Sequence, residues 1–463
     1  MSMMLDQTSD SIENQQLDVS ENGAPQQLDA EMMIETKLTD INIDCQEHVF
    51  KHLGLLDLLN IADSSKQFKT AADLVFAKKF GNERVKVLCI RPCRNQYVES
   101  NESIEWIEFA KTGLQLFRNF GHLISVLNFE PANVLAKTPR EESFSLLYKC
   151  AIEYINEYLA ESLTEIWIRQ CPEGFLKFLN PLLNISTVEI DSFGFEGLSN
   201  DWLKTLFPKL NRLTYIDFNQ SLGMIDHHFP HLEHLSVRRG YSAIAWDNIS
   251  PAVLDLNSQL RSLFNFDIGP GVNVLRSMER LQHLEELDLM WDMKYANARN
   301  EFDGEIFRFR TIKMFKIFTM DTSREYGTFP KIPFVFDQLE KCAIHAKASS
   351  FDELYKFLER NPTITDLKLQ LNCLFVNLSK IAQASRSLRH FKFRSHAFIT
   401  KENIVDFIDS LPVLNQAYFT VQLIPNDCLE QLKQYFSTHL ENEWHVSVEE
   451  VNDFTKITLE RLD

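Results

Sequence analysis

A short apolar pattern that recurs about every 25 residues constrains the fold of this chain most. Each copy has apolar residues at its first, fourth and sixth positions, with polar or small residues between them. Copies begin at Leu163, Ile185, Leu213, Leu232, Leu284, Ile312, Leu339, Ile364, Leu388 and Leu414, and others are expected at Ile124 and Leu260. Hydrophobic residues make up 44% of the chain, so one copy arises easily by chance, but a long evenly spaced series does not. The series predicts repeated units rather than separate domains.

Two copies leave details open. The copy at Leu260 allows a second register, three residues later, in which Leu263, Phe266 and Ile268 point inward. A first strand is expected near residues 85–90. The fourth and sixth positions of each copy lie two residues apart, as on one face of a strand.

The segments between the copies have helical spacing, as in residues 351–361, 402–411 and 428–436, and in a longer amphipathic stretch at 141–159. Period and pattern together resemble the leucine-rich repeat, in which each unit has one short strand and a helical or irregular return. The resemblance covers about residues 120–460. It implies a curved α/β solenoid with mostly parallel short strands and helices on its convex side.

The resemblance is divergent in one respect. The family usually places Asn or Cys five residues after the second apolar position, and here only Cys171 and Asn372 match. We therefore expect other groups to satisfy the buried loop carbonyls. The 36 phenylalanines and only 14 glycines predict that large rings fill the core. The alternative is an α/β domain with helices on both faces of its sheet, which would have longer apolar strands followed by phosphate-binding glycines; the sequence has no such loop.

The C-terminal segment is expected to close the solenoid. Trp444, Val446 and Val448 alternate, and Phe454, Ile457 and Leu459 give one last strand similar to those of the repeats. A solenoid end exposes a core and an unpaired strand edge, so an atypical, polar-faced cap is expected there.

Residues 38–80 predict three short helices. Asp44 and Glu47 have capping-box spacing at the first helix start, and Gly54 is placed to end that helix. A second helix opens at Leu55, and Ser64-Ser65 can cap a third, which carries apolar residues at Phe68, Ala71, Ala72, Val75 and Phe76. Because short helices are marginal alone, below about 12–15 residues, this segment must pack against a partner.

This stretch resembles the F-box, through which substrate receptors of SCF ubiquitin ligases bind the Skp adaptor. The match comprises residues 41–44, 49–53 and 57–59 and the aromatic Phe68. Asn42 stands where the family has Pro, which removes a preset φ, and Phe68 stands where it has Trp. The resemblance implies adaptor-facing positions at Ile41, Val49, Leu53, Leu56 and Leu58. The alternative is an ordinary helical cap on the following domain.

Charge and composition exclude several kinds of partner. The formal net charge is −18, and residues 1–36 contain eight acids and no Lys or Arg, which leaves −10 on the remainder. An acidic chain repels nucleic-acid phosphate and anionic lipid, so neither nucleic acid nor a membrane is expected as a partner. No run reaches the roughly 18 apolar residues of a membrane span, and no export signal is evident. The eight cysteines lack CxxC spacing and are expected to be reduced, in the cytosol or nucleus.

No catalytic motif is present: the sequence has no GxSxG, Walker loop, HExxH or glycine-rich dinucleotide turn. The histidines of residues 226–234 have spacing that could suit a metal. However, Leu232 and Leu235 are core positions of the repeat, so His231 and His234 should diverge. We expect no metal and no cofactor.

Strand positions between the core residues should form the concave face. Those of the early repeats are acidic with aromatic residues, and those of the later repeats are basic. Candidate target-binding residues are Trp167, Arg169, Tyr215 and Arg238 in the first group, and Lys316, Lys368, Lys392 and Arg394 in the second. The basic group suits an acidic or phosphorylated segment, to which Arg394 can bind in bidentate fashion.

The predicted organisation is a disordered acidic tail at 1–36, an F-box at 37–82 and a leucine-rich-repeat solenoid with a C-terminal cap at 83–463. The resemblance implies a non-catalytic substrate receptor that joins a target protein to the Skp adaptor and, through it, to a cullin. An interaction scaffold that acts outside a ligase is the alternative from the same residues. An enzyme is the least favoured class, because no catalytic constellation is present.

Overall fold

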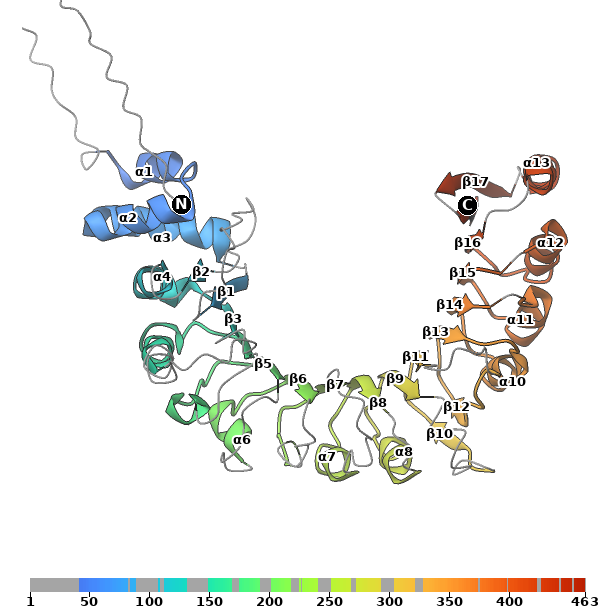
Figure 1. Ribbon diagram of the computed structural model, residues 1–463, viewed down its shortest axis with the longest axis horizontal. Coiled ribbons are helices and arrows are strands. Elements are labelled where there is room, and N and C mark those ends of the chain that lie inside the picture. Colours follow the sequence, from blue (N-terminus) through green and yellow to red (C-terminus); the bar gives the residue numbers. More distant parts are fainter. Residues whose placement is uncertain are drawn as a thin grey trace, which may run out of the picture.

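The chain forms a mixed α/β arc in which strands line the inner side and helices cover the outer side (Figure 1). The computed structural model describes residues 41–81, 84–88, 107–108, 112–130, 149–168, 175–191, 201–217, 225, 227–239, 251–267, 272–292, 304–320, 328–373, 375–397, 399–422, 426–440, 443–451 and 454–462. The predicted tail at 1–36 lies outside these residues. None of the helices in the described part is long and apolar enough to cross a membrane.

One large sheet runs through the whole arc. Its strand order is β17-β18-β16-β15-β14-β13-β11-β9-β8-β7-β6-β5-β4-β3-β1-β2, so from β3 to β16 the strands follow one another in sequence order and pair in parallel. The strands are β1 (Arg84–Leu88), β2 (Ile107–Glu108), β3 (Val126–Glu130), β4 (Glu165–Ile168), β5 (Thr187–Asp191), β6 (Arg212–Asp217), β7 (His234–Arg239), β8 (Ser262–Asp267), β9 (Glu286–Asp292), β11 (Met314–Met320), β13 (Lys341–Lys347), β14 (Asp366–Asn372), β15 (His390–Ser395), β16 (Gln416–Gln422), β17 (Trp444–Val451) and β18 (Phe454–Arg461).

Helical segments precede most of the strands of the large sheet. They are α4 (Leu114–Phe120), η3 (Gly121–Leu123), η4 (Ile155–Leu159), η5 (Phe175–Phe178), α6 (Trp202–Leu206), α7 (Pro251–Leu256), α8 (Val272–Glu279), α10 (Asp352–Arg360), α11 (Leu378–Ala384), α12 (Lys401–Asp409), α13 (Asn426–Tyr435) and η7 (Phe436–Leu440). Elements α10, α12 and α13 lie where the helical spacing predicted them, within two residues. Between β9 and β13 the outer layer also contains a two-stranded parallel sheet of β10 (Phe307–Phe309) and β12 (Phe334–Phe336).

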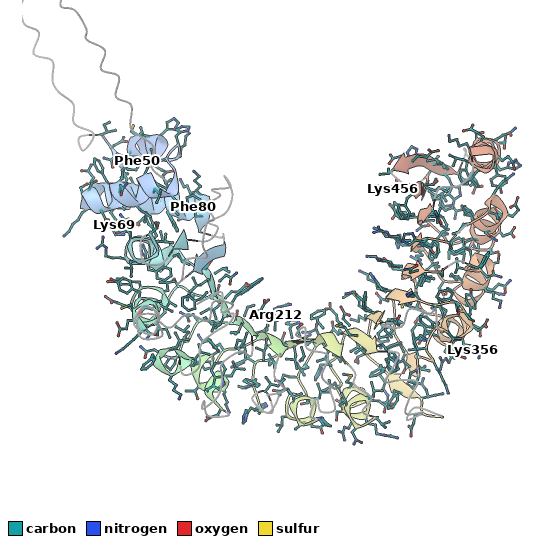
Figure 2. The ribbon with its side chains drawn as sticks, in the orientation of Figure 1. Phe50, Lys69, Phe80, Arg212, Lys356 and Lys456 are labelled. Atoms are coloured by element: carbon teal, nitrogen blue, oxygen red, sulfur yellow. The ribbon has the colours of Figure 1, made fainter. Side chains whose placement is uncertain are left out.

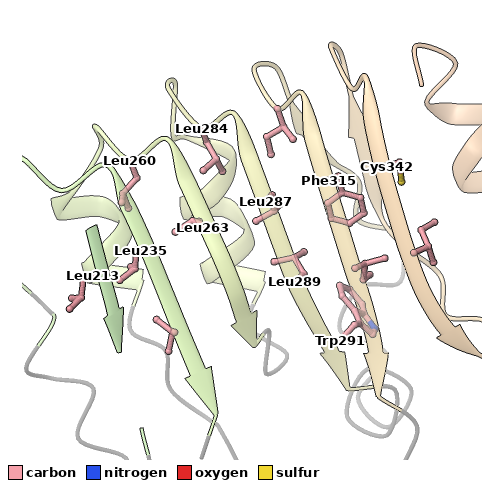
Figure 3. Close-up of a cluster of buried hydrophobic side chains, with 14 of the residues drawn as sticks. Leu213, Leu235, Leu260, Leu263, Leu284, Leu287, Leu289, Trp291, Phe315 and Cys342 are labelled. Atoms are coloured by element: carbon pink, nitrogen blue, oxygen red, sulfur yellow. The ribbon is translucent and has the colours of Figure 1, made fainter. Parts of the chain in front are cut away.

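The recurring apolar positions form continuous rows through the core. The fourth positions of six successive units pair from strand to strand in one register row, and their side chains are buried: Leu213, Leu235, Leu263, Leu287, Phe315 and Cys342 (Figure 3). Large rings fill the wider part of the core, as the composition predicted. Phe334 lies within 5.9 Å, between ring centroids, of each of Trp291, Phe309 and Phe315.

A repeated backbone contact fixes where each strand begins. In each repeat unit with this contact, the backbone N–H groups of two successive residues at the start of the strand donate to one backbone carbonyl of the preceding unit. Glu340 and Lys341, for example, both donate to the Lys313 carbonyl at 2.9 Å. The apolar rows and these contacts together give the mostly parallel repeat that the sequence predicted.

Two predicted registers need correction. Val188 of β5 pairs with Leu213 of β6, so the first core position of that unit is Leu210, and the predicted start at Leu213 was three residues too late. Both starts satisfy the apolar pattern, and pairing with β5 selects one. The ambiguity near Leu260 has a physical cause: a β-bulge between Leu263 and Phe266 shifts the register of β8 against β9.

Two buried asparagines supply hydrogen bonds that the divergent repeat lacks. Asn361, at the end of α10, accepts from the Phe336 backbone N–H at 2.7 Å and donates to the Phe357 carbonyl at 2.8 Å. Asn257, just after α7, makes the equivalent bonds to Phe229 and Val253 at 2.8 and 2.7 Å. Both side chains are fully buried. They tie a helix end to the preceding unit, at a position that is apolar in most of the other units.

The three predicted helices are present at the N-terminal end of the arc, as α1 (Ile43–Phe50), α2 (Leu55–Ser64) and α3 (Lys66–Phe80). Ser65 caps α3 as predicted, because its hydroxyl accepts from the Phe68 N–H. The predicted capping box at Asp44 is wrong, because the N-cap of α1 is Asn42, whose side chain accepts from the Cys45 N–H at 2.9 Å. Asn42 has φ −63°, the value that Pro would impose. Gly54 caps the start of α2 instead of ending α1.

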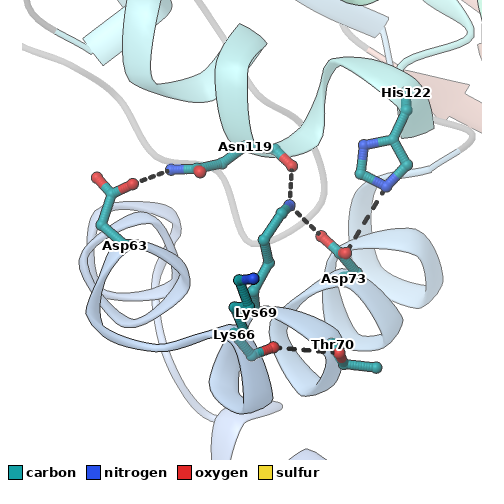
Figure 4. Close-up of polar contacts among 7 residues, drawn as sticks. All are labelled: Asp63, Lys66, Lys69, Thr70, Asp73, Asn119 and His122. Atoms are coloured by element: carbon teal, nitrogen blue, oxygen red, sulfur yellow. Dashed lines mark hydrogen bonds and ion pairs between the residues drawn. The ribbon is translucent and has the colours of Figure 1, made fainter.

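The three-helix segment, residues 41–81, packs on the first return helix of the arc. Phe76 of α3 stacks on Phe120 of α4 with centroids 4.3 Å apart. Lys69 donates to the Asn119 carbonyl at 2.6 Å and lies 3.3 Å from Asp73, as Figure 4 shows. Part of the packing partner that these short helices require is therefore supplied by the chain itself.

The C-terminal end closes differently. β17 and β18 form an antiparallel hairpin, and β18 pairs antiparallel with β16. The last predicted strand is thus present, but it runs opposite to the strands of the repeats. Ile457, Leu459 and Trp444 are buried.

Candidate protein-binding surfaces

The three-helix segment exposes large apolar side chains on its outermost helices. Val49 of α1 and Leu56 of α2 keep 47% and 57% of their surface exposed. Exposed apolar side chains on one small segment are a possible contact site, so these two residues mark a candidate contact surface. Two other predicted contact residues, Ile41 and Leu53, are partly buried, and Leu53 packs against the core.

The prediction that Leu58 faces outward is wrong. Helix α2 buries one face, formed by Leu55, Leu58, Leu59 and Ala62, at helical spacing. Leu56 lies off this face. Leu58 therefore belongs to the packing of α2 within the chain, and the exposed set that remains is centred on Val49 and Leu56.

The inner face of the arc is the second candidate surface. Along each parallel strand the residues between the core positions point to this side, and Figure 2 shows side chains along it, with Arg212 and Lys456 among those labelled. Its character changes from one end of the arc to the other.

At the N-terminal side the inner face combines acids with an aromatic ring. Trp167 and Glu189 are register neighbours, and the Trp167 indole donates to the Glu165 carboxylate. Asn128, beside Trp167 on β3, is buried. Trp167 is partly exposed and remains a candidate anchor.

The other three binding residues predicted for the N-terminal side have separate outcomes. Arg169 lies outside the described residues. Tyr215 pairs with Ile190 and Val237, which belong to the row of buried core residues, so its assignment to the inner face is wrong; the cause is the three-residue register difference in β6. Arg238 lies in β7 beside Ser236 and Val237, at an inner-face position of the backbone.

At the C-terminal side the inner face carries cations. Lys368 and Lys392 pair in register on β14 and β15; both are exposed, and neither makes an ion pair with a described residue. Lys316 is different, because its ammonium lies 2.6 Å from the Asp288 carboxylate. Its charge is therefore offset inside the chain, and the prediction that Lys316 binds a target stays a prediction. Arg394 lies over the Phe454 ring at 5.9 Å.

In the described part of the chain, no group of three or more His, Cys, Asp or Glu side chains is placed to hold a metal ion. His228 contacts the Leu256 carbonyl, and His234 lies at an inner-face strand position, where burial, and Arg212 beside it, lower its pKa.

Phe318 is an inner-face residue that sequence reasoning missed. Phe318 follows Lys316 by two residues on β11 and is exposed on the same face. The alternation of β11 could have identified it. No protein-family model matches the chain, and no curated protein is significantly similar to it.

Proposed function

We propose that this protein is the substrate-recognition subunit of an SCF-type ubiquitin ligase, with residues 41–81 as an F-box and the arc as a leucine-rich-repeat solenoid. The observation that carries the proposal is the division of α1 and α2 into two faces. One face packs within the chain, and the other exposes Val49 and Leu56 at the end of the arc. An apolar face of this kind is what a helical adaptor would bury.

The position of Asn42 supports the F-box assignment. The family has Pro at this point, and Asn42 has the same φ while its side chain caps α1. The substitution therefore retains the local geometry and adds a hydrogen bond, which is worth about 1 kcal/mol at an N-cap.

In this proposal the arc holds the target protein, and other subunits supply the chemistry. Binding raises the local concentration of the target's lysines near a ubiquitin-charged conjugating enzyme. A receptor of this type needs two separate binding surfaces and no catalytic groups of its own.

A second candidate is an interaction scaffold that acts outside a ligase. The burial of Leu58 favours it, because one of the five positions matched to the adaptor-facing set is unavailable in this packing. In this case the exposed surface of α1 and α2 would bind a different partner.

Co-precipitation with the adaptor and a cullin distinguishes the two candidates. The double substitution Val49→Ala with Leu56→Ala should abolish adaptor capture, since truncating a central interface residue typically costs about 2 kcal/mol or more. Both side chains are exposed, so the melting temperature should be unchanged. Leu53 is less suitable, because it packs against the core.

Val413→Ala is the matched control, because Val413 is similarly exposed but lies on the arc. It should leave adaptor capture intact. Adaptor capture at the wild-type level by the folded double variant would refute the F-box assignment, and a wild-type chain that captures neither adaptor nor cullin would favour the scaffold.

A further inference from the structure

A pocket of about 240 Å³ opens at the carboxyl ends of β11, β13, β14 and β15. Its lining includes four inner-face residues, one on each strand, that lie at the same level of the sheet: Phe318, His345, Gln370 and Arg394; Lys347 and Asn372 line it two residues further along. None of the described residues that line it is acidic. On a chain with a net charge of −18, a pocket without acids that gathers a guanidinium, an imidazole and an amide is an unusual concentration of hydrogen-bond donors.

The four lining residues form a single register row. Phe318 pairs with His345, His345 with Gln370, and Gln370 with Arg394. Neighbouring strands lie about 4.8 Å apart, so the backbones of His345 and Arg394 are separated by roughly 10 Å. Side chains of this length can therefore converge on one small group placed between them, above Gln370.

His345 carries the strongest sign that the pocket is a binding site. Its Nε2 atom is buried and has no hydrogen-bond partner in the structure. Unpaired buried polar atoms are rare in native proteins, because each costs a desolvation penalty. A bound acceptor at this position would satisfy it.

Positive potential surrounds this imidazole. Burial lowers the pKa of His345, and the nearby ammonium groups of Lys368 and Lys316 lower it further, while Asp288 opposes them. Lys316 is already paired with Asp288, whereas Lys368 makes no ion pair with another described residue, and Lys347 and His396 line the pocket as well. The cations lower the pKa of His345, and an anion that enters the pocket raises it.

Arg394 and Phe318 define the two sides of the pocket. The Arg394 guanidinium lies over the Phe454 ring at 5.9 Å, a contact that holds it near one orientation. On the opposite side the Phe318 ring is 42% exposed and lies 5.9 Å from the His345 ring. An exposed ring beside an anion site offers an apolar contact for whatever adjoins the anion.

We propose that this pocket binds the phosphate of a phosphoserine or phosphothreonine in the target protein, with an apolar neighbour of that residue against Phe318. The inference rests on the proposed function in that it assigns the class of target. A phosphate monoester carries a charge of about −1.5 to −2 and three acceptor oxygens, which matches donors arriving from three strands. A carboxylate offers two oxygens and half the charge, so it satisfies fewer of them.

A fluorescent peptide library with a fixed central phosphoserine or phosphothreonine, and random flanking residues, tests the proposal on the full chain. The wild type should enrich phosphopeptides that have an apolar residue near the phosphate. Arg394→Gln and His345→Gln should each weaken capture about tenfold, as expected for the loss of a charge-assisted or buried hydrogen bond. Arg394→Lys should restore only part of the affinity, because a Lys cannot bind in bidentate fashion.

Lys341→Gln is the matched control. Lys341 is exposed on the same strand as His345 and has the same charge as the other inner-face lysines, but it does not line the pocket. It should change capture less than twofold, which separates a specific pocket from general charge attraction.

The pH dependence gives an independent readout. His345 has a lowered pKa in the free protein and is neutral at pH 7, and a bound dianion favours its charged form. Binding should therefore take up a proton, and affinity should rise as pH falls from about 8 to 6.5, above the second pKa of phosphate near 6. The rise should disappear in His345→Gln.

Three outcomes overturn the proposal: equal capture of phosphorylated and unphosphorylated peptides, capture unaffected by Arg394→Gln and His345→Gln, or binding of inorganic phosphate or phosphoinositide vesicles without enrichment of any phosphopeptide. Adaptor capture, measured on the same variants, is decided by the three-helix segment. If the chain binds phosphopeptides but captures no adaptor, the ligase function is refuted and the pocket proposal stands. If the chain captures the adaptor but binds no phosphopeptide, the pocket proposal is refuted and the ligase function stands.

Discussion

The two ends of the arc meet the same physical demand in different ways. Each end must cover the core that the last repeat unit would expose to water. The N-terminal end is covered by α1, α2 and α3, which pack through Phe76 and Phe120 and through the contacts of Lys69. The C-terminal end is covered by an antiparallel hairpin, in which Ile457 and Leu459 continue the core rows.

The difference lies in what each cap leaves exposed. The helical cap exposes Val49 and Leu56. The hairpin instead ends in β17, where His445, Glu449 and Glu450 are exposed. Charged side chains on an outer strand oppose pairing with other chains. The helical cap thus exposes two large apolar side chains on its helices, and the outer strand of the hairpin exposes charge, with Leu462 exposed just after β18.

Removing the buried ring at each end should have the largest effect. Phe120→Ala should destabilise the N-terminal end by about 3–5 kcal/mol, because Phe120 is fully buried and stacked on Phe76. Trp444→Ala should instead loosen the hairpin. Hydrogen exchange measures the two effects separately, and each substitution should raise exchange near its own end while leaving the other end protected.

The two substitutions should act on separate ends because each repeat unit of the arc contacts mainly its neighbouring units. Phe318→Ala serves as the control, because that ring is exposed and should leave exchange at both ends unchanged. If either core substitution raised exchange at both ends equally, the chain would unfold as one cooperative unit, and the comparison of two independent caps would fail.

A substitution in the interior of the arc should have an intermediate effect on stability, and it should affect both of the repeat units that the substituted side chain joins. Asn361→Ala removes two hydrogen bonds shorter than 3 Å and leaves the Phe336 N–H unpaired, which should cost about 1–3 kcal/mol of stability. Chemical denaturation would measure this loss. Asn377→Ala, which removes an exposed helix cap, should cost less, about 1 kcal/mol. Equal losses in the two variants would show that Asn361 adds nothing beyond an ordinary cap.

The smallest effect concerns the polar contacts between α2 and α4. Burial raises the pKa of Asp63, but hydrogen bonds from Asn119, Gln115 and Arg118 outweigh it, so the pKa of this carboxyl is below its usual value. A lowered pKa adds stability above the unfolded-state pKa of about 3.9, and this stability is lost as pH falls through the folded-state value.

Asp63→Asn should therefore destabilise the N-terminal end by at most about 1 kcal/mol at pH 7, since the pair is largely exposed. Thermal melting at several pH values would measure the difference, which should vanish at acid pH. Asp337→Asn, which breaks the exposed pair with Arg308 on the arc, is the control and should leave exchange in α2 unchanged. A difference for Asp63→Asn that persisted undiminished at pH 2 would refute the electrostatic explanation.

Local patterns in the sequence determined much of the fold. The recurring apolar pattern alone predicts core positions at Leu287, Phe315 and Leu367, and all three side chains are buried. The helix near residues 351–361 and the cap at Ser65 are also predicted correctly, because these features depend on residues close to one another in the chain. Periodicity reports burial directly, since a side chain either faces the core or does not.

Tertiary structure decided what depends on neighbours distant in sequence. The register of β6 followed from pairing with β5, which removed Tyr215 from the inner face. The pairing of Lys316 with Asp288 joins strands 28 residues apart, and the burial of Leu58 depends on how α2 packs in the three-helix segment.

The pocket illustrates the same limit. His345, Gln370 and Arg394 are separately recognisable as strand positions from the repeat pattern, and Phe318 was missed. Only parallel pairing aligned all four in one row, because register is set by contacts between strands and not within them.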